Sequence, residues 1–317
     1  MRFARVREAG KAARIEGIGW SRRVLWAVAT VAAAAFQVGR NALQRGMMSN
    51  TGPWGATLVR FLFGLPFSLA FTAIAVAVTP HVAPQFGWAF WWPALAGALA
   101  QVIATAALLL AMHHAGFAVG TALQQSSVPL AATVGLLVFG DNLSALGWSG
   151  VAVTTLGLAV LVWPKRVEGA HHPVLGIAFG VASGLLFGFA LNAFRHAGLR
   201  LEPHHPFFSA MACVAIVQAV QAAGLGAYLA LRDRAALVAV VAGWRGSLGA
   251  GLFGALASSG WFLALNLAPA AAVRALGVIE MPIAAAAGHR LFREALSLRQ
   301  GLGVILITAG VAMTAMY

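Results

Sequence analysis

The chain has 317 residues, of which 61% are hydrophobic and 9% are charged, whereas ordinary soluble domains are about 25% charged. So few charged side chains cannot cover a water-soluble surface, and the mean hydropathy of +0.84 indicates a membrane protein. The one cysteine, Cys213, excludes an internal disulfide framework, and we expect no redox chemistry.

The net charge of +13 would suggest a nucleic-acid partner if the chain were soluble. Here the basic residues gather at the ends of apolar stretches and in a tail over residues 1–22. Retention on the cytoplasmic side and anionic lipid headgroups are the usual reasons for such positions. We therefore expect membrane lipids as partners and no nucleic acid.

The first apolar stretch follows this tail directly. Residues 21–26 read SRRVLW and loosely resemble a twin-arginine export signal. The apolar run nevertheless continues to about Met47, which is long enough to cross a hydrocarbon core of about 30 Å. We interpret it as the first transmembrane helix rather than as a cleaved signal peptide.

Apolar stretches separated by short polar or Pro- and Gly-rich breaks predict ten helices in two sets of five. The first set spans 24–46, 54–79, 87–112, 115–138 and 146–163. After a polar linker over 165–172, the second set spans 173–196, 206–231, 245–266, 268–289 and 299–316. Tryptophans near predicted helix ends, such as Trp88 and Trp244, support these boundaries because indole rings favour the headgroup region.

The two sets repeat one another. A shift of 153 positions, without gaps, places SSVPLAATVGLLVFGDNLSALGWSG on IEMPIAAAAGHRLFREALSLRQGLG and pairs Pro129 with Pro282. The first helices of the two sets align with an offset of 151. Because each unit has five helices, an odd number, the second must enter the bilayer from the opposite face. The predicted fold is thus an all-α integral membrane protein of ten transmembrane helices, built as two inverted five-helix repeats over 23–164 and 173–317.

These paired elements, together with LVRFLFGLPF at 58–67, resemble the drug/metabolite transporter superfamily, specifically its ten-helix branch with two EamA-type repeats. The resemblance covers residues from about 24 to 316, and Asp141 stands where the family usually has glutamate. It implies a secondary transporter, often an exporter, whose central cavity is lined by helices from both halves. It also implies that the fifth and tenth helices are peripheral, and it implies no particular substrate.

Charged side chains within predicted spans are the first candidates for function, because each is unfavourable by at least about 2.5 kcal/mol at a helix centre. Arg40, Arg60 and Arg274 lie within predicted spans, and Glu280 is the only acidic residue that does. Polar residues at i, i+3, i+4 and i+7 form a stripe along the first helix that suits a wet cavity: Gln37, Arg40, Asn41 and Gln44. Arg40 and Arg60 flank one short loop and could share an anionic group, unless both snorkel to the interface.

Glu280 is near the middle of its predicted helix, where a carboxylate could take up and release a proton as a cavity opens to each side. Arg274, six residues earlier, lies about 120° around an α-helix from it, so we expect no direct pair between the two. The alternatives to proton coupling or substrate contact are an ion pair with an arginine of another helix and a protonated side chain at a helix kink.

Neutral polar residues extend this candidate site: Gln101, Thr121, Gln125 and Asn192. Asn192 is the repeat counterpart of Asn41. Ser127 and Thr121 are the repeat counterparts of Glu280 and Arg274, so the second half has the charged version of the site. Hydrogen bonding between helices is the alternative interpretation of the neutral residues.

We expect neither a metal nor another cofactor, because the three histidine pairs lie at predicted helix ends without carboxylate clusters nearby. We also expect no enzyme, because the sequence has no Ser/His/Asp arrangement, phosphate loop or HExxH helix.

The sequence therefore predicts a secondary active transporter of the inner membrane that exports a small polar or amphipathic metabolite by alternating access, with Glu280 as the proton-linked residue. One alternative is an uncoupled exchanger of anionic metabolites that uses Arg40 and Arg60. Another is a non-transporting scaffold or lipid-handling subunit. The basic tail and the family resemblance put both termini in the cytoplasm, against the charges of several later loops. A homodimer is left open.

Overall fold

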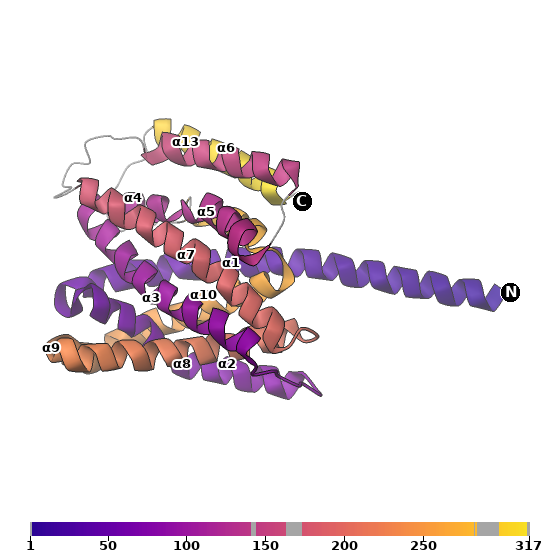
Figure 1. The fold of residues 1–317 in the computed structure, drawn as a ribbon, viewed down its shortest axis with the longest axis horizontal. Helices are drawn as coiled ribbons and strands as arrows, with labels where there is room; N and C mark the ends of the chain where they lie inside the picture. The colour runs from indigo at the N-terminus through magenta and orange to yellow at the C-terminus, as the bar shows by residue number, and fades with distance from the viewer. Residues whose placement is uncertain (1, 141–143, 163–172, 282, 284–297, 316–317) are drawn as a thin grey trace.

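The computed structural model describes residues 2–140, 144–162, 173–281, 283 and 298–315, and all regular structure within these ranges is helical (Figure 1). The predicted linker over 165–172 lies outside the described residues. So do Asp141 and Pro282, and most of the predicted helix 268–289 beyond Met281.

The first helix, α1, spans Arg2–Leu62, and α2 spans Leu65–Val78. The apolar part, Val24–Val78, has 55 residues, whereas about 20 residues suffice to cross a bilayer. It is divided at Gly52, whose positive φ of 64° favours glycine, directly before Pro53. A second break at Phe63–Gly64 follows because Pro66 has no N–H to donate to the carbonyl of Leu62. The predicted helix 54–79 is therefore interrupted.

The prediction of one continuous helix over 115–138 is wrong. After α3 (Trp88–Ala115), the chain forms α4 (Phe117–Gln124), α5 (Ser127–Val134) and a π-helical turn, η1 (Gly135–Phe139). Pro129 lacks the N–H that would bond to the carbonyl of Gln125. That carbonyl instead accepts a bond from the backbone N–H of Val128 at 2.9 Å, which tightens the chain between α4 and α5.

The remaining elements begin with α6 (Ala145–Val162), α7 (Pro173–Leu201) and α8 (Pro206–Arg232). They continue with α9 (Arg234–Ala242), α10 (Trp244–Leu267), α11 (Ala270–Leu276), the 3-10 turn η2 (Gly277–Ile279) and α13 (Leu298–Ala315). The sequence analysis did not predict α9. Asp233 caps its first turn, since its carboxylate accepts a bond from the N–H of Ala236 at 2.9 Å.

Within the described ranges, five helical segments are long and apolar enough to cross a membrane, namely Val24–Val78, Trp88–Ala115, Val174–Leu201, Pro206–Arg232 and Trp244–Leu267. Leucine and valine side chains on their outer faces are exposed, as they are where helices face lipid tails rather than water. The fold is thus that of an all-α membrane protein.

The helices of the bundle pack mainly in pairs. The most extensive contacts join α3 to α7, α1 to α10, and α6 to α13. Figure 1 shows α6 and α13 side by side along one edge of the bundle, so the fifth and tenth predicted helices are peripheral. The bounds of α6 and α13 are 153 positions apart at both ends, and so are the first residues of α4 and α11.

The contact between α6 and α13 depends on two glycines that the same shift relates. A Cβ on Gly157 would lie 2.7 Å from the backbone nitrogen of Ile307 and 2.9 Å from the carbonyl oxygen of Gly303. A Cβ on Gly310 would lie 2.5 Å from the nitrogen of Thr154. Each helix therefore approaches the other closely at its own glycine, in the manner of membrane helices that pack through small residues.

Two connections from different parts of the chain meet at one end of the bundle. The carboxylate of Glu202, after α7, accepts a bond from the N–H of Ala83, between α2 and α3, at 2.8 Å. The N–H of Gln85 also donates to the carbonyl of Leu201 at 2.8 Å. The bond from Ala83 is the main reason that the pKa of Glu202 lies below its usual value.

We predict that Gly157→Val separates α6 from α13 and lowers the free energy of unfolding by about 1–3 kcal/mol, because the side chain would collide with backbone atoms. Thermal unfolding of the purified protein in detergent measures the effect. Gly301→Val on α13 is the matched control, since a Cβ there meets nothing within 4 Å. Equal melting temperatures for the two variants would contradict this packing.

Candidate functional site

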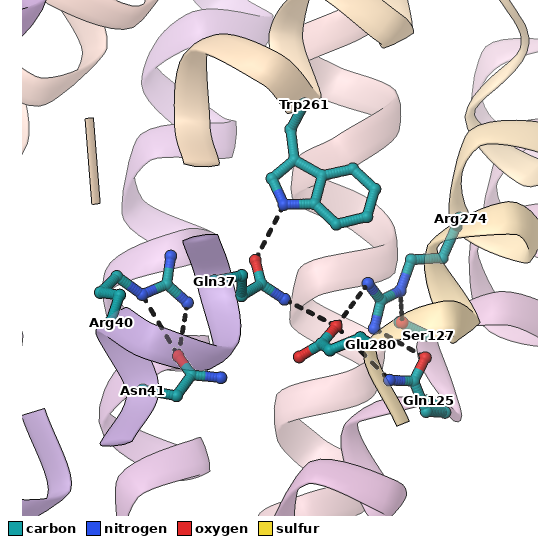
Figure 2. A network of polar contacts seen from close by, with 8 residues as sticks. All are labelled: Gln37, Arg40, Asn41, Gln125, Ser127, Trp261, Arg274 and Glu280. Atoms are coloured by element: carbon teal, nitrogen blue, oxygen red, sulfur yellow. Dashed lines mark hydrogen bonds and ion pairs between the residues drawn. The ribbon is translucent and has the colours of Figure 1, made fainter. Parts of the chain in front are cut away.

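A buried polar network surrounds Glu280, the residue that follows η2 (Figure 2). Its Oε2 accepts bonds from Nε2 of Gln37 at 2.9 Å, from Nη1 of Arg274 at 3.4 Å and from Nε2 of Gln125 at 3.5 Å. These donors come from α1, from α11 and from the break between α4 and α5. The carboxylate thus joins the first half of the chain to the second.

Arg274 is held on several sides. Its Nε donates to the hydroxyl of Ser127 at 2.7 Å, and its Nη2 donates to Oε1 of Gln125 at 2.9 Å. Its guanidinium carbon lies 5.5 Å from the ring centroid of Trp261, within the range of a cation–π contact. The charge and several donors of this arginine are therefore matched within the network.

The direct pair between Arg274 and Glu280 corrects the sequence analysis, which expected none. That expectation assumed an unbroken α-helix. Three of the five intervening residues form the 3-10 turn Gly277–Ile279, which has about 3.0 residues per turn and so returns every third residue to the same face. The tighter winding reduces the angular separation of the two side chains.

Trp261 extends the network toward α10. Its indole N–H donates to Oε1 of Gln37 at 2.9 Å, so Gln37 bridges Trp261 and Glu280, as Figure 2 shows. A Cβ on Gly277 would lie 2.4 Å from the Trp261 ring. Glycine at 277 therefore allows the indole to lie against η2.

Arg40 and Arg60 are buried beside this network, with 0% and 2% of their surfaces exposed, so neither snorkels to the interface. Arg40 donates to Oδ1 of its neighbour Asn41 through Nη2 at 2.6 Å and through Nε at 3.2 Å. Arg60 donates to the hydroxyls of Thr105 at 3.0 Å and Ser258 at 3.5 Å. The whole predicted stripe on α1 is buried: Gln37, Arg40, Asn41 and Gln44.

A small enclosed cavity of about 20 Å³ lies at this centre, which is room for about one water molecule. Polar groups from both halves line it: Gln37, Arg60, Gln101, Gln124, Ser258 and Arg274. Apolar side chains, most of them aromatic, form the rest of its wall: Phe187, Leu191, Phe194, Trp261 and Phe262. The site is closed in this conformation, so a solute larger than water needs the helices to move.

The remaining predicted residues have different positions. Gln101 lines the cavity and accepts a bond from Nε2 of Gln221 at 2.8 Å. Thr121 is buried, and its hydroxyl has no hydrogen-bond partner in the described part of the chain. Asn192 donates to the carbonyl of Ala131 in α5 at 2.9 Å, which is an interhelical bond, and to that of Gly188 in its own helix at 3.0 Å.

Sequence reasoning missed three members of the site: Thr105, Ser258 and Trp261. Trp261 had a usable signal. It lies well inside a predicted span, whereas the tryptophans used to support the boundaries are near helix ends, and a buried indole N–H usually has a partner. Thr105 and Ser258 had no such signal, because hydroxyls inside membrane helices commonly bond to their own backbone.

Within the ranges that the structure describes, no three His, Cys, Asp or Glu side chains are grouped to hold a metal ion.

Comparisons with known proteins identify the fold alone. No family model and no curated protein matches the chain. A solved structure described only as the crystal structure of a protein is 17% identical and has a TM-score of 0.60. The alignment covers 93% of this chain and 97% of that chain, so the whole chain shares the fold of that protein.

We predict strong coupling between Arg274 and Glu280 in a double-mutant cycle. Arg274→Gln or Glu280→Gln alone should lower the free energy of unfolding by about 3–5 kcal/mol, because each leaves a buried charge without its counter-charge. The double variant should lose less than the sum. Equilibrium unfolding in detergent measures all four proteins.

The control cycle combines Glu280→Gln with Arg232→Gln, an exposed arginine at the end of α8. The effects of these two substitutions should add. Additive effects for Arg274 and Glu280 as well would contradict the pair.

Proposed function

We propose that the chain is a secondary transporter that moves a small metabolite across the inner membrane by alternating access between two inverted five-helix halves. The observation that carries this proposal is the buried network at Glu280, in which Gln37, Gln125 and Ser127 of the first half bond to Glu280 and Arg274 of the second. Buried polar groups inside a membrane bundle mark solute and ion pathways.

Several features support an inverted repeat. The bounds of α6 and the first residue of α4 recur after 153 positions, and the same shift relates α3 to α10. The offset of 151 between the first helices of the two sets relates α1 to α7. If each helix is replaced by its repeat counterpart, the contact between α1 and α10 becomes the contact between α7 and α3. The repeat therefore relates the two extensive contacts to each other. The helix breaks at 125–126 and 277–279 lie at the centre, where broken helices form the sites of many transporters. These features, with the paired motifs, favour the ten-helix EamA-type branch of the drug/metabolite transporters.

Glu280 supplies a means of proton coupling. When ionised, Oε2 accepts three hydrogen bonds, two of them from the first half of the chain. Protonation removes the charge that attracts Arg274 and leaves one oxygen as a donor, so contacts between the halves weaken. Proton uptake from one side and release to the other would thus link proton movement to the opening of the site, with export as the proposed direction.

Ten crossings with both termini in the cytoplasm fit the loop contacts. With this topology the α2–α3 and α7–α8 connections are on the same side, and Ala83 of the first contacts Glu202 of the second. The basic tail favours the cytoplasm for that side.

Counterflow into proteoliposomes tests the proposal. Hits from a thermal-stabilisation screen of a metabolite library would be preloaded, and uptake of labelled solute measured with and without a pH gradient. We expect wild-type protein to exchange a hit at zero gradient and to accumulate it when a gradient is imposed. Glu280→Gln should keep exchange and lose at least about tenfold of the gradient-driven accumulation.

Glu202→Gln is the matched control, because it neutralises a buried carboxylate outside the central network. It should retain gradient-driven accumulation. If no solute is exchanged by wild-type protein while lipid copurifies tightly, the scaffold or lipid-handling alternative replaces the transporter. If Glu280→Gln loses both exchange and gradient-driven accumulation, that carboxylate binds the substrate instead of coupling transport to protons.

A further inference from the structure

The centre of the bundle has an excess of positive charge. Among the described residues of the apolar helices, the buried charged side chains are three arginines and one glutamate. Arg274 lies 3.4 Å from Glu280, and these two charges offset each other. Arg40 and Arg60 then remain, and no carboxylate lies within 4 Å of either in the described part of the chain. Two unmatched positive charges are expensive in a low-dielectric interior.

Their hydrogen bonds do not remove this excess. In the part of the chain that the structure describes, Arg40 and Arg60 donate only to the neutral oxygens of Asn41, Thr105 and Ser258. Nη1 of Arg40 and Nε of Arg60 have no partner among the described residues. A guanidinium bonds best to a planar anion that accepts two parallel bonds, which an amide oxygen or a hydroxyl cannot do. Both arginines therefore retain donors suited to an oxyanion.

The two arginines are near one another and near the cavity. Carbon atoms of both side chains lie within 4 Å of the point that a Cβ on Gly254 would occupy, at 3.5 Å for Cδ of Arg40 and 3.8 Å for Cβ of Arg60. Arg60 lines the central cavity, and the aromatic rings of Phe187, Phe194 and Phe262 form part of the same wall. The charged groups thus adjoin an apolar surface.

We propose that the substrate of the transporter is an amphipathic organic anion whose carboxylate or phosphate binds between Arg40 and Arg60. Its apolar body lies against the aromatic wall of the cavity. This inference rests on the proposed transport function and adds the charge of the substrate to it. While Glu280 is ionised, Arg274 is paired with it and does not bind the anion of the substrate.

The test uses a charge-matched panel. Each member is a triplet of a carboxylic acid, its neutral amide and its amine analogue on the same aromatic or aliphatic body, with inorganic phosphate as an added probe. Thermal stabilisation and counterflow are measured for wild-type protein and for Arg40→Met, Arg60→Met and Arg232→Gln. The last variant removes an exposed arginine and controls for net charge.

We expect the acids, and not their amides or amines, to stabilise wild-type protein and Arg232→Gln. Arg40→Met and Arg60→Met should bind the same acids at least tenfold more weakly. Without ligand, both variants should melt at or above the wild-type temperature, because each loses an uncompensated buried charge. Arg40→Lys and Arg60→Lys keep the charge without the forked donors and should weaken binding less than methionine does.

Other outcomes would overturn the inference. If an amide or amine is exchanged as well as its acid, the protein is a transporter but its substrate is not selected as an anion. If the methionine variants bind acids unchanged, the arginines do not bind the substrate. If these variants melt well below wild type and anions do not stabilise the wild type, the arginines are structural. If wild type exchanges no solute at all, the proposed function fails together with the inference.

Discussion

The ion pair between Arg274 and Glu280 is the interaction on which the centre of this protein depends. Neither charge is tolerable alone in an apolar bundle, and even the pair is stable only when its remaining donors and acceptors are matched. Gln37, Gln125 and Ser127 supply that matching. Because these three residues belong to the first half of the chain and the ion pair to the second, the same bonds that satisfy the charges hold the halves together.

Broken helices make this arrangement possible. A continuous α-helix satisfies its own backbone and would keep Gln125 and Ser127 on different faces, about 160° apart. The break between α4 and α5 brings both side chains to Arg274, and the 3-10 turn before Glu280 brings the carboxylate to the same guanidinium. Irregular backbone at membrane depth is tolerated where protein surrounds it, and here Gly277 and Val278 of the 3-10 turn are buried and the turn contacts α1, α11 and α13. The breaks in the helices therefore place the polar side chains that bond to Arg274.

Hydropathy was sufficient to predict the helical class and most helix positions, because apolar length is the main requirement for crossing a bilayer. It was insufficient for the breaks, since Pro129 and Pro66 act through single missing N–H groups that leave hydropathy unchanged. The assumption of ideal α-helix geometry caused the error about Arg274 and Glu280. Repeat symmetry also misled in one place, because Asn41 bonds to Arg40 whereas its counterpart Asn192 bonds to backbone carbonyls. Corresponding positions in two halves share a place in the fold without sharing a role.

The central claim is that the two halves move against each other around the network at Glu280. Distances between paired spin labels test it most directly. One pair is at Gln85 and His204, in the α2–α3 and α7–α8 connections, and the other is at Asn50, next to the kink at Gly52, and Arg245, at the start of α10; all four residues are exposed. The native Cys213 is buried and does not compete for labelling. We expect a transported solute or protonation to change the two distances in opposite directions. We also expect Glu280→Gln to shift the populations of the two conformations without solute and without protonation. Distances that stay single and unchanged under all these conditions would contradict alternating access.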